Sequence, residues 1–211
     1  MDKRKKEQFK QIEKALIKEL KTASKTFNYK AISNSLYKED NNFFVHCVYF
    51  ATYIDNALKL TVWNYVKTYE SDNLFWTIFD MKDNIGEKDS LRANGAYTMP
   101  SFKIGEYSLK IEDTTDLNEA SKNFIKKIAM KNDDFIDSLS RNTKKFDCYL
   151  LEQSGYLREE LIKMIANIEL KNLRDAKEMA EGEIVKGNRG GFRNNDKDIY
   201  EYILEYCKIN S

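Results

Sequence analysis

The sequence predicts an α+β fold with a mainly antiparallel sheet, preceded by an N-terminal helix and covered by a helical C-terminal half. The spacing of apolar residues carries this prediction. They recur every three or four positions before residue 30, at every second position from about residue 31 to 111, and again with helical spacing after residue 113. Because strands and helices occupy separate regions of the chain, a doubly wound α/β fold is disfavoured.

The N-terminal segment 3–25 has the pattern of an amphipathic helix and is strongly basic. Its apolar positions are Phe9, Ile12, Leu16, Ile17 and Leu20. Residues 1–30 contain ten Lys and Arg against four Asp and Glu. This excess fits either a solvated outer helix face or a surface that faces an anionic partner.

Three strands are predicted next, over 31–38, 43–54 and 57–69, with turns at 39–42 and at Asp55-Asn56. Both faces of the second strand are apolar, which is typical of the middle of a covered sheet. The second and third strands form the clearest hairpin of the sequence. His46 lies among apolar residues in this hairpin, so we interpret it as a core or sheet-face residue rather than a catalytic one.

The middle of the chain is less regular. Residues 74–79 form an apolar block that fits either a strand or one helical turn, and an acidic loop follows at 80–90. The segment 91–99 leads to Pro100. Two short strands, 102–104 and 107–111, are predicted to form a hairpin around Gly105-Glu106.

The C-terminal half is predicted to be helical. A capping box of Asp116 and Glu119 opens a helix that reaches about residue 128, and a shorter helix surrounds residues 135–139. The segment 146–151 is ambiguous, 157–184 has the pattern of one long helix, and a last helix begins at Asp196 as its cap. Since no Pro/Gly/Ser-rich linker lies near residue 113, we expect a single α+β domain over 1–211, in which residues 1–113 are helix and strands and residues 114–211 are helical.

The composition narrows the class of protein. With 35 Lys and Arg against 34 Asp and Glu, the net charge of +1 disfavours a generic nucleic-acid binder. No apolar stretch is long enough to cross a membrane, and the N-terminus lacks the features of a signal peptide. Cys47, Cys148 and Cys207 are far apart and odd in number, which favours a reducing compartment. We therefore expect a cytoplasmic protein without membrane contact.

The sequence indicates no catalytic residue, cofactor or metal ligand. A single histidine leaves no room for a two-histidine metal site, and neither a P-loop nor a dinucleotide-binding motif is present. Free thiols without a histidine partner do not suggest cysteine catalysis. An enzyme is accordingly less favoured than a binding protein, and no cofactor is expected.

Three groups of residues could nevertheless contact a partner. Lys59, Trp63 and Lys67 alternate on one strand face, where rings could stack on bases and ammonium groups could meet phosphates; a packed sheet face is the alternative. The loop 187–193 offers Arg189, Phe192 and Arg193 between glycines, and it could equally be a flexible connection between helices. Arg92, after the acidic loop, could hold an anion or form a structural ion pair.

The run from the basic helix through SLYKEDNNFFVHCVYFATYID to SDNLFWTIFDM and SLRANGAYTMPSF resembles small stand-alone bacterial proteins known only as domains of unknown function. Some of these proteins are encoded near toxin or defence genes. The resemblance covers roughly the first half of the chain and lies in the general residue pattern and in the order of the predicted elements. It implies a non-enzymatic binding role and transfers no functional residue.

Three functional hypotheses follow. The first is a cytosolic protein-binding module, such as an immunity or regulatory partner protein, with loops 80–90 and 187–195 as the contact surface. The second is nucleic-acid binding through the basic helix and the residues Lys59, Trp63, Lys67, Arg189 and Arg193. The third is a metal-dependent enzyme that uses the acidic loop.

Overall fold

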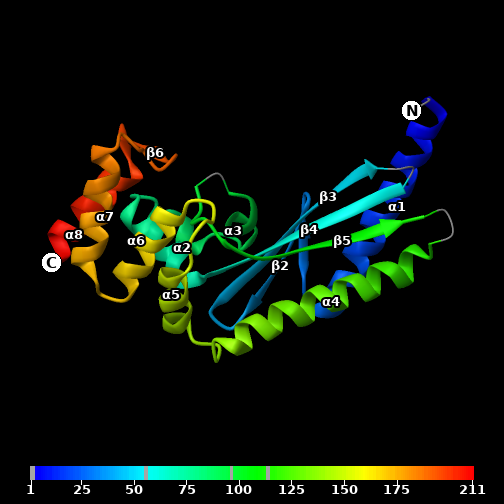
Figure 1. The fold of residues 1–211 in the computed structure, drawn as a ribbon, viewed down its shortest axis with the longest axis horizontal. Coiled ribbons are helices and arrows are strands. Elements are labelled where there is room, and N and C mark those ends of the chain that lie inside the picture. Colours follow the sequence, from blue (N-terminus) through cyan, green and yellow to red (C-terminus); the bar gives the residue numbers. More distant parts are fainter. Residues whose placement is uncertain (1–2, 55–56, 96, 113–114) are drawn as a thin grey trace. The chain divides into compact units, whose positions relative to one another are not determined.

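The computed structural model describes residues 3–54, 57–95, 97–112 and 115–211 and confirms the α+β class (Figure 1). The turn predicted at Asp55-Asn56 lies outside these residues. Among the described helices, none combines the length and the apolar character needed to cross a lipid bilayer.

Five strands form one antiparallel sheet in which each strand pairs with its neighbour in the chain. In the β1–β2 pair, Lys30 lies opposite Tyr37 and Ile32 opposite Ser35. A separate two-stranded sheet joins β6 to β7. The strands are β1 (Lys30–Ile32), β2 (Ser35–Asp40), β3 (Phe43–Ile54), β4 (Ala57–Thr68), β5 (Phe102–Ile111), β6 (Arg193–Asn194) and β7 (Lys197–Asp198).

Most of the helical structure follows the sheet, as predicted, although two helices lie between β4 and β5. The helices are α1 (Lys3–Ser24), α2 (Tyr69–Ile78), α3 (Ser90–Asn94), α4 (Leu117–Ser138), α5 (Thr143–Glu152), α6 (Glu159–Glu169), α7 (Leu173–Val185) and α8 (Ile199–Asn210). Two 3₁₀ turns, η1 (Lys25–Phe27) and η2 (Lys82–Gly86), complete the elements of the described residues.

The contacts divide the chain into two compact units, and each unit is discontinuous in sequence. The first comprises Met1–Glu39, Val45–Tyr65 and Lys103–Ser138, and the second comprises Asp40–Phe44, Val66–Phe102 and Leu139–Ser211. The division therefore does not fall at residue 113. The helix α4 belongs with the strands, whereas the last residues of β4 belong with the C-terminal helices.

In the first unit, α1 and α4 cover the same face of the sheet (Figure 1). The ring of Phe9 in α1 lies 3.8 Å, centroid to centroid, from that of Tyr53 in β3. The amide nitrogen of Asn132 in α4 lies 4.0 Å from Sγ of Cys47 in the same strand. Because side chains alternate along a strand, Cys47 and Tyr53 point to one face, and both helices pack there.

A buried polar group fixes α4 against this face. Nδ2 of Asn64 in β4 donates to Oδ1 of Asn132 at 2.8 Å, and Nδ2 of Asn132 donates to the hydroxyl of Tyr29 at 2.7 Å. Both asparagine side chains are fully buried. Such a hydrogen-bonded network specifies how helix and sheet align, because any slip would leave buried polar atoms without partners.

The second unit is built around α6, which packs against α2, α5, α7 and α8. Its side chains are buried on nearly all sides, as expected for a central helix. The buried residues are Leu161, Ile162, Met164, Ile165, Ala166, Asn167 and Ile168.

The single helix predicted over 157–184 is wrong, because two helices, α6 and α7, occupy this segment. The apolar spacing of three or four residues slips to five between Ile168 and Leu173. One helix cannot keep both groups on the same face across such a slip. The chain instead turns at Lys171, whose φ of 66° lies in the left-handed region.

The hairpin predicted around Gly105-Glu106 is also wrong, since β5 runs without a turn from Phe102 to Ile111. A Cβ atom at Gly105 would lie only 3.0 Å from the ring of Tyr107. The glycine therefore permits close contact of a ring with the backbone rather than a turn.

Several boundaries differ from the predictions. The predicted strand 31–38 is divided into β1 and β2, and the helices predicted around 117–128 and 135–139 are one helix, α4. The apolar block 74–79 lies mostly in α2, and the ambiguous segment 146–151 lies in α5. The cap of α8 is Asp198 rather than Asp196; its Oδ1 accepts from the backbone N–H of Tyr200 at 3.1 Å.

Candidate functional site

The structure places the seven candidate contact residues in three separate groups. Lys67 and Arg92 meet in the interior of the second unit, and Lys59 and Trp63 share a sheet face of the first. The remaining three line a surface hollow of the second unit: Arg189, Phe192 and Arg193.

Lys67 and Arg92 belong to a buried ionic network centred on Asp72. The Lys67 Nζ atom lies 2.9 Å from Oδ1 of Asp72, and Arg92 NH1 lies 3.2 Å from its Oδ2. Lys67 also donates to the carbonyl oxygens of Arg92 and Met99, at 3.0 and 3.1 Å. Lys67 thus has three acceptors inside the unit, whereas Arg92 donates from NH2 to Oδ1 of Asn73 at 2.9 Å and its Nε and NH1 atoms have no hydrogen-bond acceptor among the described residues.

Burial makes both cations inaccessible. The exposed fractions of Lys67 and Arg92 are 2% and 5%. The Arg92 guanidinium carbon lies 4.5 Å from the ring centre of Tyr69 and 4.7 Å from that of Trp76. The network ties the chain before Pro100 to α2, so these two residues hold the fold rather than contact a macromolecular partner.

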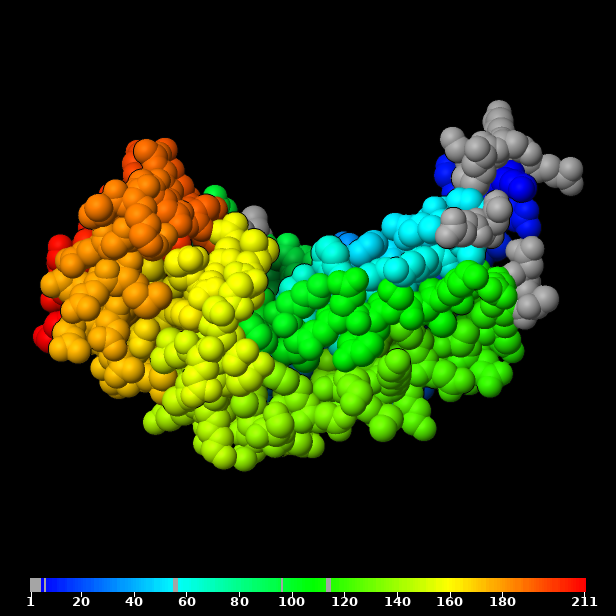
Figure 2. Space-filling view, in the orientation of Figure 1, coloured from blue at the N-terminus to red at the C-terminus, as the bar shows by residue number. Residues whose placement is uncertain are grey.

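Asn64 of β4 faces α4, so Lys59 and Trp63, which alternate with it, lie on the opposite face of the sheet. Strands β4 and β5 are neighbours there, and both reach the surface in Figure 2. The Trp63 ring is partly exposed, with the Phe50 ring at 4.8 Å and the Lys103 Nζ atom at 4.9 Å from its centre. The cation that lies over the Trp63 ring is therefore Lys103, which the alternation did not single out, and the predicted Lys67 lies in the Asp72 network instead.

An acidic residue occupies the same face. Glu106 accepts a hydrogen bond from Lys103 at 2.7 Å. This bond is the main reason why the pKa of Glu106 lies below its usual range, with smaller contributions from Trp63 and Lys59. The Glu106 carboxylate partly offsets the charge of Lys59 and Lys103, so this face is less basic than the two lysines alone would make it.

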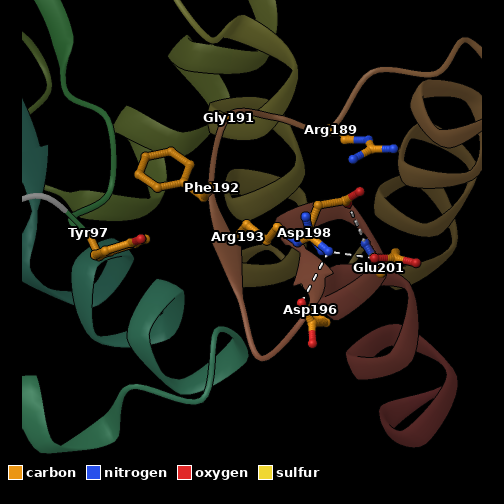
Figure 3. Close-up of a pocket in the computed structure, with 8 residues that line it drawn as sticks. All are labelled: Tyr97, Arg189, Gly191, Phe192, Arg193, Asp196, Asp198 and Glu201. Carbon is orange, nitrogen blue, oxygen red and sulfur yellow. Dashed lines mark hydrogen bonds and ion pairs between the residues drawn. The ribbon is translucent and has the colours of Figure 1, made fainter.

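The third group surrounds a hollow of about 510 Å³ on the second unit (Figure 3). We call it the α8 hollow. Aromatic rings lie at one end and carboxylates from the start of α8 at the other (Figure 3). Its lining residues are Tyr97, Arg189, Gly191, Phe192, Arg193, Asp196, Asp198 and Glu201.

The aromatic end of the α8 hollow is anchored in the core. The Phe192 ring lies 5.2 Å from that of Phe75 and 6.3 Å from that of Tyr97. The backbone carbonyl of Tyr97 accepts a hydrogen bond from Trp76 Nε1 at 2.6 Å, while the Tyr97 side chain is 39% exposed. The Tyr97 ring therefore faces solvent, beside the mostly buried ring of Phe192.

The loop that carries the arginines is ordered by contacts on both sides. Arg158 donates to the carbonyl oxygen of Gly190, and its guanidinium carbon lies 4.4 Å from the ring centre of Phe192. Asn194 Nδ2 donates to the carbonyl of Phe79 at 2.9 Å. The loop thus has contacts on both sides and closes in the short β6–β7 hairpin.

The charged groups of the α8 hollow are unequally engaged. Arg193 pairs with Asp196 at 3.2 Å, and the Asp198 and Glu201 carboxylates accept from backbone N–H groups in the capping box of α8. Arg189 is exposed, and its guanidinium has no ion pair or hydrogen bond among the described residues. It is thus the cation in the lining that is available to a ligand.

The acidic loop of the metal hypothesis forms η2 and the residues around it. Asp80, Asp83 and Glu87 are exposed there. In the portion of the chain that the structure describes, no group of three potential metal ligands is close enough to hold an ion.

Sequence reasoning missed a buried carboxyl pair in the second unit, Asp147 of α5 and Glu169 of α6. Asp147 is 1% exposed, and the Ser71 hydroxyl lies 3.4 Å from Glu169 Oε2. Desolvation raises the pKa of Asp147 to about 6, and desolvation together with the Asp147 charge raises that of Glu169 to about 9; Glu70 adds to both shifts. With a pKa of about 9, the Glu169 carboxyl keeps its proton near neutral pH. Because the two residues are 22 positions apart, no local pattern in the sequence indicates that they lie close together.

Comparisons with protein-family models, with curated proteins and with solved structures find no significant match, so the arrangement of residues has to carry the functional argument.

Proposed function

We propose that the chain is a protein-binding module whose α8 hollow receives an acidic segment of a partner protein. The observation that carries the proposal is the position of Arg189, an exposed guanidinium without an internal partner at the edge of a hollow. Guanidinium groups bind carboxylates through two parallel hydrogen bonds, which gives both strength and orientation. We therefore assign the carboxylate of a partner side chain to Arg189.

The three acidic residues that line the α8 hollow are already bonded to other groups of the chain. Asp196 is paired with Arg193, and Asp198 and Glu201 are bonded to N–H groups at the N-terminus of α8. The positive end of the helix dipole further offsets the charge of these two carboxylates. An incoming acidic side chain consequently meets Arg189 as the uncompensated group.

The aromatic end supplies the apolar contact. Tyr97 is exposed by 39%, and the 9% exposed Phe192 lies beside it. Tyrosine, phenylalanine and arginine are enriched in protein interfaces, and tyrosine and arginine are frequent among the residues that dominate binding energy. We expect an aliphatic or aromatic partner residue next to the carboxylate.

The fixed conformation of the loop favours binding. Because Arg158 and Asn194 already hold the loop, a partner does not have to order it on association. Interfaces that are ordered before binding lose less conformational entropy. A role as a regulatory or immunity partner in the cytoplasm is consistent with such a surface and with three cysteines that form no disulfide.

The test is selection from a display library of random peptides against the immobilised full chain. We expect enriched peptides that place Asp or Glu next to an apolar residue, and we expect Arg189→Glu to abolish their binding. Lys171→Glu, the same charge change at another exposed position, should leave binding intact. Failure to enrich any peptide, or equal binding by both variants, would contradict the proposal.

A further inference from the structure

We infer that the outer side of α1 binds the phosphate backbone of double-stranded DNA through a ridge of lysines. We define the lysine ridge as Lys10, Lys14, Lys18, Lys21 and Lys25. Four of its members are exposed, and Lys21 is half-buried. This surface belongs to the first unit and is independent of the α8 hollow.

The spacing places the backbone positions of the ridge on one side, with Lys25 at the start of η1. The intervals are four, four, three and four residues. With 3.6 residues per turn, the five positions fall within an arc of about 80°, over a length of about 22 Å. The Lys21 side chain interacts with the hydroxyl of Tyr49 in β3, so the four exposed lysines are the ones that remain available. The opposite side of α1 carries the buried Leu16, Leu20 and Ala23, which pack in the first unit. Since the apolar side of the helix is already used, the helix cannot insert it into a lipid surface.

The ridge lysines other than Lys10 have no acidic residue one turn away, whereas Lys10 has Glu7 and Glu13 three positions away. Other exposed helices contain lysines that have an acidic partner. In α7, Lys177 lies 3.9 Å from Glu181, and in α4, Lys131 lies 3.3 Å from Asp134. Lys14, Lys18 and Lys25 have no acidic residue three or four positions away in either direction.

The exposed ridge lysines also have no ion pair in the described structure. Lysines that follow one another at four-residue intervals repel and destabilise the helix. Lys10, Lys14 and Lys18 form such a series within α1. The phosphates of a bound polyanion would attract each ammonium group and so offset the repulsion between the lysines.

Double-stranded DNA fits the ridge better than a single strand or RNA. Single strands are bound by stacking of bases on aromatic rings, and the ridge contains no aromatic residue. Duplex RNA is recognised partly through its 2′-hydroxyls, whereas simple ammonium groups suit phosphates. DNA presents a charge about every 1.7 Å of its axis, so a straight row of lysines can meet several phosphates.

The test is fluorescence anisotropy of a labelled DNA duplex with the full chain at several salt concentrations. Binding should weaken with salt, with a slope of log K against log salt of about −4, which corresponds to the four exposed ridge lysines. The double variant Lys14→Glu/Lys18→Glu should bind at least about tenfold more weakly and have a slope of about −2. Thermal unfolding of this variant checks that the exposed substitutions leave the fold intact.

The matched control is Lys82→Glu/Lys88→Glu, which changes the net charge equally at exposed positions of the second unit. It should bind duplex as the unmodified chain does. Equal loss in both double variants, or no duplex binding at low salt, would overturn the inference. So would preferential binding of a single-stranded oligonucleotide, or of vesicles of phosphatidylcholine and phosphatidylserine.

Discussion

The ammonium nitrogen of Lys67 lies 2.9 Å from Oδ1 of Asp72, and both residues are buried almost completely. Desolvation lowers the pKa of Lys67, and the Asp72 carboxylate acts in the opposite direction. Asp72 also accepts from the backbone N–H of Met99 at 3.0 Å. The Asp72 carboxylate thus binds Lys67, Arg92 and the backbone N–H of Met99, which makes it the centre of the contacts between α2, α3 and the chain before Pro100.

Removing this carboxylate should strongly destabilise the chain. Asp72→Ala leaves two buried cations without their counter-charge, and breaking a buried ion pair costs about 3–5 kcal/mol of the free energy of unfolding. Arg174→Ala, which removes an exposed ion pair of α7, should cost less than about 0.5 kcal/mol. Denaturant unfolding measures both. A loss below about 1 kcal/mol for Asp72→Ala would show that the network is not structural.

The pair Asp147 and Glu169 should make stability fall as pH rises. The folded-state pKa values of about 6 and about 9 lie above the ordinary carboxyl values, so the folded chain binds more protons than the unfolded one between about pH 4 and 9. This contribution is present at low pH and is lost as pH rises through the folded-state values.

Glu169→Gln should remove most of this pH dependence. We expect the variant to exceed the unmodified chain in free energy of unfolding by roughly 2 kcal/mol at about pH 8, and by much less at about pH 5. Glu87→Gln, at an exposed loop position, should change neither value. A difference between Glu169→Gln and the unmodified chain that does not depend on pH would refute the raised pKa of Glu169.

Only one of the three thiols should react quickly with a thiol reagent. Cys148 is exposed, whereas Cys47 and Cys207 are buried. Burial raises the pKa of Cys47 to about 12, which suppresses the reactive thiolate. Titration of the native chain with a chromogenic disulfide should give one fast equivalent, and Cys148→Ser should eliminate it. Two fast equivalents would show that a buried cysteine is accessible.

The loop of the α8 hollow should tolerate a methyl group at Gly187 better than at Gly190. Both glycines have positive φ, of 75° and 66°. A Cβ at Gly190 would lie 2.5 Å from Cγ2 of Ile199, while nothing lies within 4 Å of one at Gly187. Gly187→Ala should cost about 1 kcal/mol from the backbone alone, and Gly190→Ala roughly 2–4 kcal/mol. Equal unfolding free energies would mean that the loop adjusts freely.

Periodicity predicted the two long central strands well, but it predicted a hairpin where β5 runs straight and missed the break between α6 and α7. The alternation over 43–54 and 57–69 predicted β3 and β4 closely, because buried and exposed positions of a strand differ strongly in side-chain type. The break between α6 and α7 depends on a single left-handed residue, Lys171. A lysine carries no local signal for that conformation, so the five-residue interval between Ile168 and Leu173 is the signal that the sequence offers for the break.

The candidate contacts illustrate the same difference. Alternation correctly placed Lys67 on the face of Trp63, but it could not show that Asp72 and Arg92 would bury it. These contacts depend on how the chain between β4 and β5 folds back. The grouping of Arg189, Phe192 and Arg193 was predictable because the three residues are within five positions, whereas Tyr97 is a distant neighbour supplied by tertiary structure.

The most direct test of the proposed function is photo-cross-linking from position 97 in cells of the organism that makes the protein. Tyr97 is replaced by benzoylphenylalanine, and Tyr107, on β5 of the first unit, serves as the control position. We predict one discrete protein adduct from position 97 that resists nuclease, is absent from position 107, and disappears when Arg189→Glu is added. An adduct that persists with Arg189→Glu, or no protein adduct from position 97, would contradict the assignment of the α8 hollow as a protein-binding site.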